Sequence, residues 1–339
     1  MKMSLWMKGT FFALTAWAVM SITGCSKNVK IQVLEPAKID RAAQTKQIAV
    51  SDFKDDTVGL AGKIEALLAK QTLDGQKYFT TISRDEMDRI LDEQKLQYSG
   101  VVNDSKIVEA GEILGAQAFI SGEVISASVK DNRHYEKRTK CVDDNCKTTR
   151  AYLVSCLSRT IDLSANIKMT DVSKADIIYA DAYSKSYQWK HCQDDRNVLP
   201  SKSDGLARLA NLVANEFVYQ LTPHYTTMTV SLLDDPDLDY TSKQEKTLDV
   251  AIDYIEAGRL DKAEQLLGTL LTSTQNRSYV AAYNLGVVKE AQGELEDAKR
   301  LYLMADQLQQ EPVDEINQAV VRIDRIMLNR EKALSQISQ

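Results

Sequence analysis

The sequence predicts a mixed α/β domain followed by an all-α domain. Strand-like and helical segments alternate between residues 48 and 125, which predicts a sheet with helices packed on it. Near the carboxyl end a glycine-led hexapeptide recurs, which is typical of stacked helical repeats. The chain has 339 residues, more than one hydrophobic core usually holds. We therefore expect an α/β domain over residues 47–228, a linker over 229–241 and a helical domain over 242–339.

Residues 1–24 are typical of a signal peptide. Lys2 and Lys8 precede an apolar core at residues 11–20. That core has the length found in signal peptides and is too short to span a bilayer as a helix. We therefore expect the segment to direct export and to be absent from the mature protein.

The end of this segment predicts a lipid anchor. Residues 22–25 read Ile-Thr-Gly-Cys, which resembles the lipobox of bacterial lipoproteins and indicates lipidation at Cys25. Ser26 stands where an Asp favours inner-membrane retention in such lipoproteins, so the outer membrane is expected, on its periplasmic face. A single acyl chain anchors a protein only marginally, whereas two or more acyl chains on one cysteine anchor it stably. Residues 25–46 are short and polar, which predicts a tether.

The charge balance limits the range of partners. The chain has 42 basic and 48 acidic residues and a net charge of −6 at pH 7. The signal peptide holds two of the lysines and no acidic residue, so the mature chain has a net charge of about −8. An acidic protein repels the phosphates of nucleic acids and anionic lipids. We therefore expect no nucleic-acid partner.

Four cysteines follow the predicted lipidation site. They are Cys141, Cys146, Cys156 and Cys192. An even number in an exported protein predicts two disulfides, for which three connectivities are possible. The alternative is a zinc site that combines these cysteines with His134 or His191, because the gap between Cys141 and Cys146 is close to zinc-ligand spacing. We predict disulfides and no metal, since periplasmic thiols tend to be oxidised.

The first half of the α/β domain is predicted to alternate strands with helices. A strand-like run covers residues 48–53, and residues 59–72 place apolar side chains on one helical face. The pattern then predicts a strand at 78–82, a helix opened by a capping box at Ser83 and Glu86, a helix near 107–114 and a strand at 118–125.

The second half of the α/β domain is predicted to contain two strands and a helix. Apolar and polar residues alternate over 159–169, which predicts a half-buried strand with one wet face. A partner strand is expected from 177 to about 187. Residues 205–221 predict a helix whose buried face carries Leu206, Leu209, Val213, Phe217 and Leu221. The Asp-rich segment over 229–241, which contains a proline, predicts the linker.

The carboxyl-terminal region contains an internal repeat. Residues 258–263 recur as 293–298, which resembles the tetratricopeptide repeat with its period of about 34 residues. The positions that pack paired helices in that family are occupied here by Tyr254, Gly258, Ala263, Leu285, Gly286, Gly293, Ala298, Tyr302 and Ala305. Lys289 departs from the usual aromatic. Two units need a cap, which predicts a last helix over 316–334, and the resemblance implies a surface that binds a protein partner.

The α/β region, residues 46–222, resembles the curli-assembly CsgG family. The motifs that carry the resemblance are Ile-Ala-Val-Ser-Asp-Phe at 48–53, Phe-Thr-Thr-Ile-Ser-Arg at 79–84, Ile-Leu-Asp-Glu-Gln at 90–94, Ser-Gly at 99–100 and Leu-Gly-Ala-Gln-Ala-Phe-Ile-Ser-Gly at 114–122. Members of that family are outer-membrane lipoproteins, and some form oligomeric secretion pores for amyloid subunits. A similar fold occurs in lipoprotein activators of peptidoglycan synthases. The resemblance therefore implies a sheet-and-helix domain and an envelope role.

Two segments depart from the pore-forming members, which insert β-hairpins with an apolar band facing lipid. Residues 129–150 carry charged side chains throughout, and residues 189–204 are short, charged and bracketed by Cys192 and Pro200. Neither segment can present an apolar band to hydrocarbon. We predict that both are periplasmic loops pinned by disulfides.

The sequence contains no pattern typical of catalysis. It has no nucleophile elbow, phosphate-binding loop or dinucleotide fingerprint. Its three histidines, His134, His191 and His224, lie in the charged loops or after a helix-ending proline, which favours solvated roles. We predict a non-enzymatic assembly or scaffold factor without cofactor, which binds envelope proteins through its repeats. The alternatives are a curli-type secretion channel component, which would be a homo-oligomer, and an activator of a peptidoglycan synthase.

Overall fold

The computed structural model describes residues 27–82 and 112–338, which divide into two compact units. Of the described residues, one unit holds 27–31 together with 229–320, and the other holds 32–82, 112–228 and 321–338. The second unit is mixed α/β and contains a five-stranded sheet, and a helical region follows, as predicted. The predicted signal peptide, Cys25 and the elements predicted between residues 83 and 111 lie outside the described residues.

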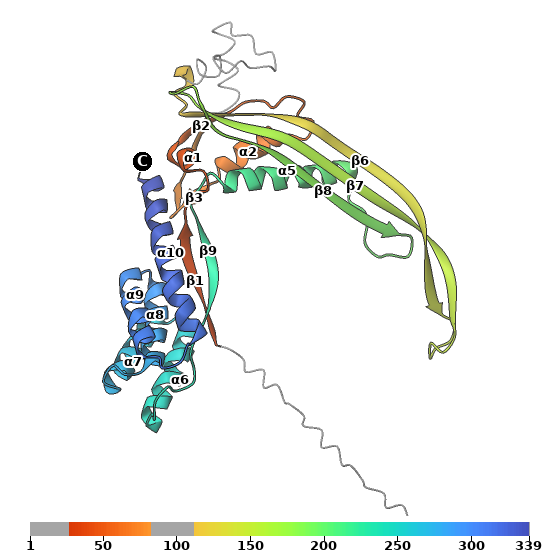
Figure 1. The fold of residues 1–339 in the computed structure, drawn as a ribbon. Helices are drawn as coiled ribbons and strands as arrows, with labels where there is room; N and C mark the ends of the chain where they lie inside the picture. Colours follow the sequence, from red (N-terminus) through yellow and green to blue (C-terminus); the bar gives the residue numbers. More distant parts are fainter. Residues whose placement is uncertain (1–26, 83–111, 339) are drawn as a thin grey trace, which may run out of the picture. The chain divides into compact units, whose positions relative to one another are not determined.

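The five-stranded sheet combines a parallel part with a long antiparallel part. Its strand order is β5-β2-β6-β7-β8. The strands are β2 (Gln47–Val50), β5 (Thr80–Ile82), β6 (Ala118–Cys141), β7 (Thr149–Asp171) and β8 (Ile177–Cys192). Strand β2 pairs in parallel with β5 and β6, whereas β6, β7 and β8 pair antiparallel. The β6–β7 hairpin continues past the end of β8 (Figure 1).

Two helices cover one face of the inner part of this sheet. They are α2 (Leu60–Leu68) and α5 (Lys202–Tyr219), and they also contact each other. Helix α5 begins where the Ser201 hydroxyl accepts a hydrogen bond from the amide of Asp204 at 3.0 Å. Its apolar side chains recur at helical spacing and are buried, as are the alternate side chains of β7 from Ile161 to Met169. The hydrophobic core therefore lies between the two helices and the inner part of the sheet.

The prediction of two charged loops is wrong. Residues 129–150 form most of a β-hairpin in which β6 and β7 pair continuously from Val129 opposite Ile161 to Cys141 opposite Thr149. Strand β8 likewise extends to Cys192, so only the short segment before α5 is a loop. None of the described helices covers the outer hairpin in Figure 1, and its sequence lacks the apolar alternation by which a half-buried strand is recognised.

The prediction of a tether over residues 25–46 is also wrong. This region forms β1 (Asn28–Glu35) and α1 (Asp40–Gln44), with Ile31 and Ala42 buried. Strand β1 pairs with β9 (His224–Ser231), which includes the first residues of the predicted linker. A short hairpin of β3 (Thr72–Leu73) and β4 (Gln76–Lys77) completes the described strands. Short polar segments can thus be ordered by long-range strand pairing.

The helical region contains two hairpins that repeat each other. They are α6 (Ser242–Glu256) with α7 (Leu260–Ser273), and α8 (Tyr279–Gln292) with α9 (Leu295–Leu308). The bounds of α7 coincide with those of α9 after the shift that relates Gly258 to Gly293. Both glycines have a positive φ, 73° and 80°, which favours glycine between paired helices.

The last helix, α10 (Asp314–Ile337), is longer than the predicted cap and does not belong to the repeat region alone. Its residues from Val321 onward belong to the α/β unit, where Ala333 is buried in the core. The Gln336 side chain accepts a hydrogen bond from the Ala37 amide at 2.8 Å and donates one to the Ala37 carbonyl at 3.2 Å. The predicted boundary at residue 242 therefore does not hold for the end of the chain. Among the described helices, none combines the length and the apolar character that crossing a membrane requires.

Candidate functional site

The residues predicted to pack the repeats lie in the two helical hairpins and differ in their burial. Most are buried, namely Ala263, Leu285, Gly286, Ala298, Tyr302 and Ala305. Tyr254 is half-buried, and Gly258 and Gly293 are exposed in the turns. A Cβ on Gly286 would come within 2.7 Å of the Tyr302 ring, so α8 and α9 approach closely only because this position has no side chain. No family match tests these assignments.

One face of α8 is occupied by a segment of the same chain. The Asn284 side chain accepts a hydrogen bond from the Leu233 amide at 3.0 Å and donates one to the Leu233 carbonyl at 2.6 Å. The Tyr283 hydroxyl donates to the Ser231 carbonyl at 2.7 Å. Leu232, between these two contacts, is buried. The predicted linker is therefore bound through its backbone.

Asp237 fixes the same segment to the start of α8. Its carboxylate accepts hydrogen bonds from the Tyr279 amide at 2.6 Å, the Ser278 hydroxyl at 2.7 Å and the Tyr240 hydroxyl at 2.9 Å. A carboxylate is favoured at a helix N-terminus, where backbone amides are unsatisfied. Burial raises the pKa of Tyr240. Sequence reasoning missed Asp237 and Asn284, because one lies in a segment interpreted as a linker and the other is an ordinary polar residue of a helix.

The four cysteines form two disulfides, and the structure decides their connectivity. Cys141 is bonded to Cys146 across the turn of the β6–β7 hairpin, and Cys156 is bonded to Cys192 across β7 and β8. Cys156 and Cys192 are directly opposite in the register and are buried, whereas Cys141 and Cys146 are exposed. The disulfides predicted from the cysteine count are therefore present.

The buried disulfide decides against the zinc alternative. Potential ligand atoms of His134, Glu136 and Cys156 lie within 4.8 Å of one another. The Cys156 sulfur is bonded to Cys192, so it offers no thiolate, and Glu136 already accepts a hydrogen bond from Lys190 at 2.8 Å. This donor set does not fit a zinc ion. His191 lies on the neighbouring position of β8, whose side chain points to the opposite face.

An ion-pair network surrounds this disulfide on the outer part of the hairpin. Arg138 donates to Asp194 at 2.7 Å and to Asp195 at 3.1 Å, and the Asp195 carboxylate also accepts from the Cys192 amide at 2.8 Å. The Cys192 amide and then Arg138 lower the pKa of Asp195. Lys190 and then His134 lower the pKa of Glu136. The charges on this face are therefore neutralised within the protein.

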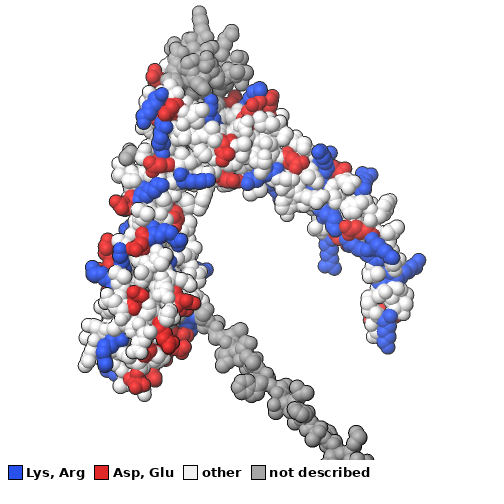
Figure 2. Space-filling model, viewed as in Figure 1, with Lys and Arg blue, Asp and Glu red and all other residues white. Residues whose placement is uncertain are grey.

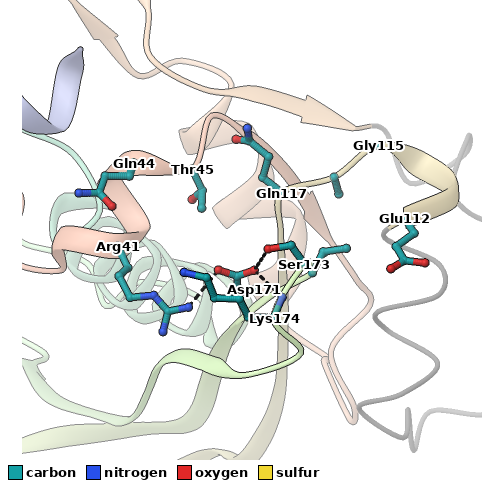
Figure 3. Close-up of a pocket in the computed structure, with 11 residues that line it drawn as sticks. Arg41, Gln44, Thr45, Glu112, Gly115, Gln117, Asp171, Ser173 and Lys174 are labelled. Atoms are coloured by element: carbon teal, nitrogen blue, oxygen red, sulfur yellow. Dashed lines mark hydrogen bonds and ion pairs between the residues drawn. The ribbon is translucent and has the colours of Figure 1, made fainter. Parts of the chain in front are cut away.

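A polar pocket of about 610 Å³ lies beside α1 and the turn between β7 and β8. Figure 3 shows Arg41 directed at Asp171, and its guanidinium donates to Asp171 at 2.9 Å and to Asp176 at 2.7 Å. The Asp171 carboxylate also accepts from the Ser173 hydroxyl and the Lys174 amide. Arg41 lowers the pKa of Asp176, and a general acid or base works best with a pKa near the operating pH. Sequence analysis missed the pocket because it placed Arg41 in a tether.

The comparison with protein families supports the resemblance found in the sequence. Residues 26–191 match the family described as curli production assembly/transport component CsgG. The match begins at β1, which agrees with the ordered amino-terminal strand, and ends in β8. No curated protein matches the sequence.

Several solved structures are similar to parts of the chain at low TM-scores. The LpoB C-terminal domain from Salmonella enterica has 9% identity and a TM-score of 0.27, and the match covers 43% of this chain and 94% of that one. Lipoprotein GNA1162 from Neisseria meningitidis has 14% identity and a TM-score of 0.25, with 51% and 98% covered. The PelC dodecamer from Paraburkholderia phytofirmans has 15% identity and a TM-score of 0.25, with 57% and 96% covered.

Proposed function

We propose that the protein is a non-enzymatic assembly factor of the bacterial cell envelope, lipidated at Cys25 and held on the periplasmic face of the outer membrane. The observation that carries this proposal is the match of residues 26–191 to a family of curli assembly and transport components. Two disulfides agree with an exported protein, because disulfides persist in oxidising compartments. The two carboxyl groups that Arg41 binds in the pocket, Asp171 and Asp176, have lowered pKa values, whereas a general acid needs a raised one.

We further propose that the helical hairpins bind a protein partner in the manner of tetratricopeptide repeats. The contact between Asn284 and the backbone of Leu233 supports this, because it holds an extended segment on the inner helix of the second hairpin. The repeat shift places Asp249 of α6 at the position of Asn284, and Asp249 is exposed. The partner would therefore contact α6 first, since the equivalent part of α8 is already occupied.

A photo-crosslinker at Asp249 tests the partner site in the lipidated, full-length protein in its own cell. We expect a discrete crosslinked protein with the reporter at Asp249, and a much weaker product with the reporter at Gln265, an exposed residue of α7. Equal crosslinking from both positions, or none from Asp249, would contradict the proposed site. A Cys25→Ser chain should lose the crosslink and be released from the membrane fraction by a high-salt wash that leaves the lipidated chain bound, which tests the anchor separately.

The secretion-channel alternative is favoured by the family description and makes a different prediction. A channel requires a ring of subunits and steady ion conductance, whereas an assembly factor requires neither. Light scattering on the detergent-extracted, lipidated protein measures its size, and planar bilayers measure its conductance. We expect a monomer or small oligomer without conductance, because the outer hairpin carries charged side chains on both faces. A large conducting ring would overturn the assembly-factor proposal.

A further inference from the structure

The end of the β6–β7 hairpin exposes apolar side chains on one face. In this register Lys137 is opposite Leu153 and Tyr135 is opposite Ser155, so Tyr135 and Leu153 are diagonal neighbours on the same face. Tyr135 is 73% exposed and Leu153 is 69% exposed. Val142 in the turn is 62% exposed. An exposed group of large apolar side chains on a protruding ribbon indicates a contact surface.

Cations surround these apolar side chains. Arg133 and Lys137 lie on the same face as Tyr135. Lys147 lies in the turn, and Lys140 and Arg150 flank the turn on the opposite face; all five cations are exposed. Lys137, Lys147 and Arg150 form no ion pair with any residue of 27–82 or 112–338. Figure 2 shows the end of the hairpin as blue and white surface. We call Arg133, Tyr135, Lys137 and Leu153 the hairpin-end face.

Apart from Asp143 and Asp144 in the turn, the acidic residues near the hairpin end are paired away from Arg133 and Lys137. Glu136 lies on the opposite face and accepts from Lys190, and the Asp194 and Asp195 carboxylates are held by Arg138. Asp143 accepts hydrogen bonds from the backbone amides of Lys147 and Thr148 inside the turn. The hairpin thus places Arg133 and Lys137 on the face opposite Glu136 and Arg138, whose charges are paired within the protein. This separation is invisible in the linear sequence.

We propose that the hairpin-end face docks on an anionic phospholipid surface. Tyrosine and leucine side chains favour the boundary between headgroups and acyl chains, and lysine and arginine beside them are attracted to anionic headgroups. Charge complementarity selects the anionic lipid surface, because Arg133 and Lys137 lie beside the exposed Tyr135 and Leu153 on one face and Lys147 is exposed in the turn. The Cys141–Cys146 disulfide fixes the turn, so the hairpin loses little conformational entropy when it docks.

The same charges limit the contact to the surface. Lys140, Lys147 and Arg150 lie at the turn, the part of the hairpin that would have to enter hydrocarbon first. Placing such cations in the bilayer centre is costly, whereas at the interface they remain hydrated and meet phosphate. The inference goes beyond the proposed function, because it concerns a contact that does not use the acyl chains of Cys25.

Vesicle binding tests this inference with the mature chain carrying Cys25→Ser, so that acyl chains are absent. We expect binding to phosphatidylcholine vesicles that contain phosphatidylglycerol, weak binding to pure phosphatidylcholine, and loss of binding as salt screens the charges. Arg133→Glu with Lys137→Glu should weaken binding on the order of tenfold or more. The matched control is Lys243→Glu with Lys246→Glu on α6, which makes the same charge change at exposed lysines and should retain binding.

A second pair of variants separates docking from folding. Tyr135→Ser with Leu153→Ser removes two exposed apolar groups and should weaken vesicle binding while urea unfolding stays unchanged. Tyr135→Trp in a Trp189→Phe background should give an emission shift to shorter wavelength when anionic vesicles are added. The proposal would be overturned if the α6 control lost vesicle binding to the same extent, or if binding did not depend on the anionic lipid. It would also be overturned if the emission of the Tyr135→Trp variant did not shift on addition of anionic vesicles. Binding to polyglutamate without binding to vesicles would also overturn it and would indicate an acidic protein partner.

Discussion

The inner and outer parts of the β6–β7–β8 sheet bury opposite faces of the same strand. In the inner part of β7 the alternate residues from Ile161 to Met169 are buried beneath α2 and α5. In the outer part the buried residues are Val154, Cys156 and Ser158, which lie on the other face. The burial pattern therefore changes face near residue 160, within one uninterrupted strand.

The difference shows two ways to hold a strand in place. The inner part gains stability from burial of apolar side chains under helices. None of the helices in residues 27–82 or 112–338 covers the outer part. There the disulfide between Cys156 and Cys192 and the ion pairs of Arg138 and Glu136 hold the strands together. Ion pairs at an exposed site contribute little individually, so the disulfide is expected to dominate the outer part.

The largest effect is expected from a cavity in the inner part. Leu163→Ala removes a buried side chain that is 1% exposed and should cost about 3 kcal/mol, because the helices cannot close the space. Leu153→Ala, the matched change at a residue that is 69% exposed, should cost less than about 0.5 kcal/mol. Urea unfolding followed by Trp189 fluorescence measures both. Similar losses for the two variants would refute the division of the strand.

The next effect is expected from the disulfide of the outer part. Replacing Cys156 and Cys192 together by Ser opens a link across 36 positions and should cost about 3 kcal/mol. The matched pair at Cys141 and Cys146 spans only 5 positions and should cost about 2 kcal/mol or less. In the variant without the Cys156–Cys192 disulfide, the exchange rates of backbone amide hydrogens should rise in residues 149–158 and stay low in 161–169. An increase spread evenly over β7 would show that the two parts are not held independently.

A smaller effect is expected where α5 meets the sheet. A Cβ on Gly205 would come within 2.0 Å of the end of the Ile161 side chain. That side chain can turn aside, so Gly205→Ala should cost about 1 kcal/mol. Gly75→Ala is the control for backbone strain. Gly75 has a φ of 77° in a turn, and no atom lies within 4 Å of the added Cβ, so this variant shows the cost of strain without crowding. Adding Ile161→Val to Gly205→Ala should restore part of the lost stability. If stability is not restored, crowding between the added Cβ and Ile161 is not the cause of the loss.

The smallest effect is expected from the ion pairs of the outer part, as a dependence on pH. Lys190 holds the pKa of Glu136 below its ordinary value of 4.5. A carboxyl group with a lowered pKa stabilises the fold above its ordinary pKa, and this stabilisation is lost as the pH falls through the lowered value. The urea midpoint should therefore fall less in Glu136→Gln than in the wild type between about pH 6 and about pH 3. Identical falls would show that Glu136 contributes nothing measurable.

Much of the inner part could be predicted because its physics is local. The period-two pattern over 159–169 and the helical spacing in 205–221 predicted elements that the structure contains. The repeat at Gly258 and Gly293 likewise predicted the two turns that the helical hairpins contain. The outer hairpin was not predicted because backbone hydrogen bonds order it. Backbone pairing does not require alternating apolar side chains, so the hydropathy pattern does not indicate these strands.

The candidate site followed the same division. Composition was enough to predict disulfides, but only the pairing of β7 with β8 placed Cys156 opposite Cys192. Asn284 and Asp237 could not be predicted, because their partners lie 51 and 41 positions away in the segment taken for a linker. A single polar residue in a sequence does not indicate that it forms a long-range hydrogen bond.

By itself the sequence determined the order of the two kinds of structure, the cysteines available for pairing and the resemblance to a family of curli assembly components, because these depend on local pattern and residue type. Only the tertiary structure decided which cysteines are bonded, which face of β7 is buried at each point and where the charges of residues 133–153 are separated. The physical reason is that register and pairing join residues far apart in the chain, and the charge or burial of a side chain depends on those neighbours.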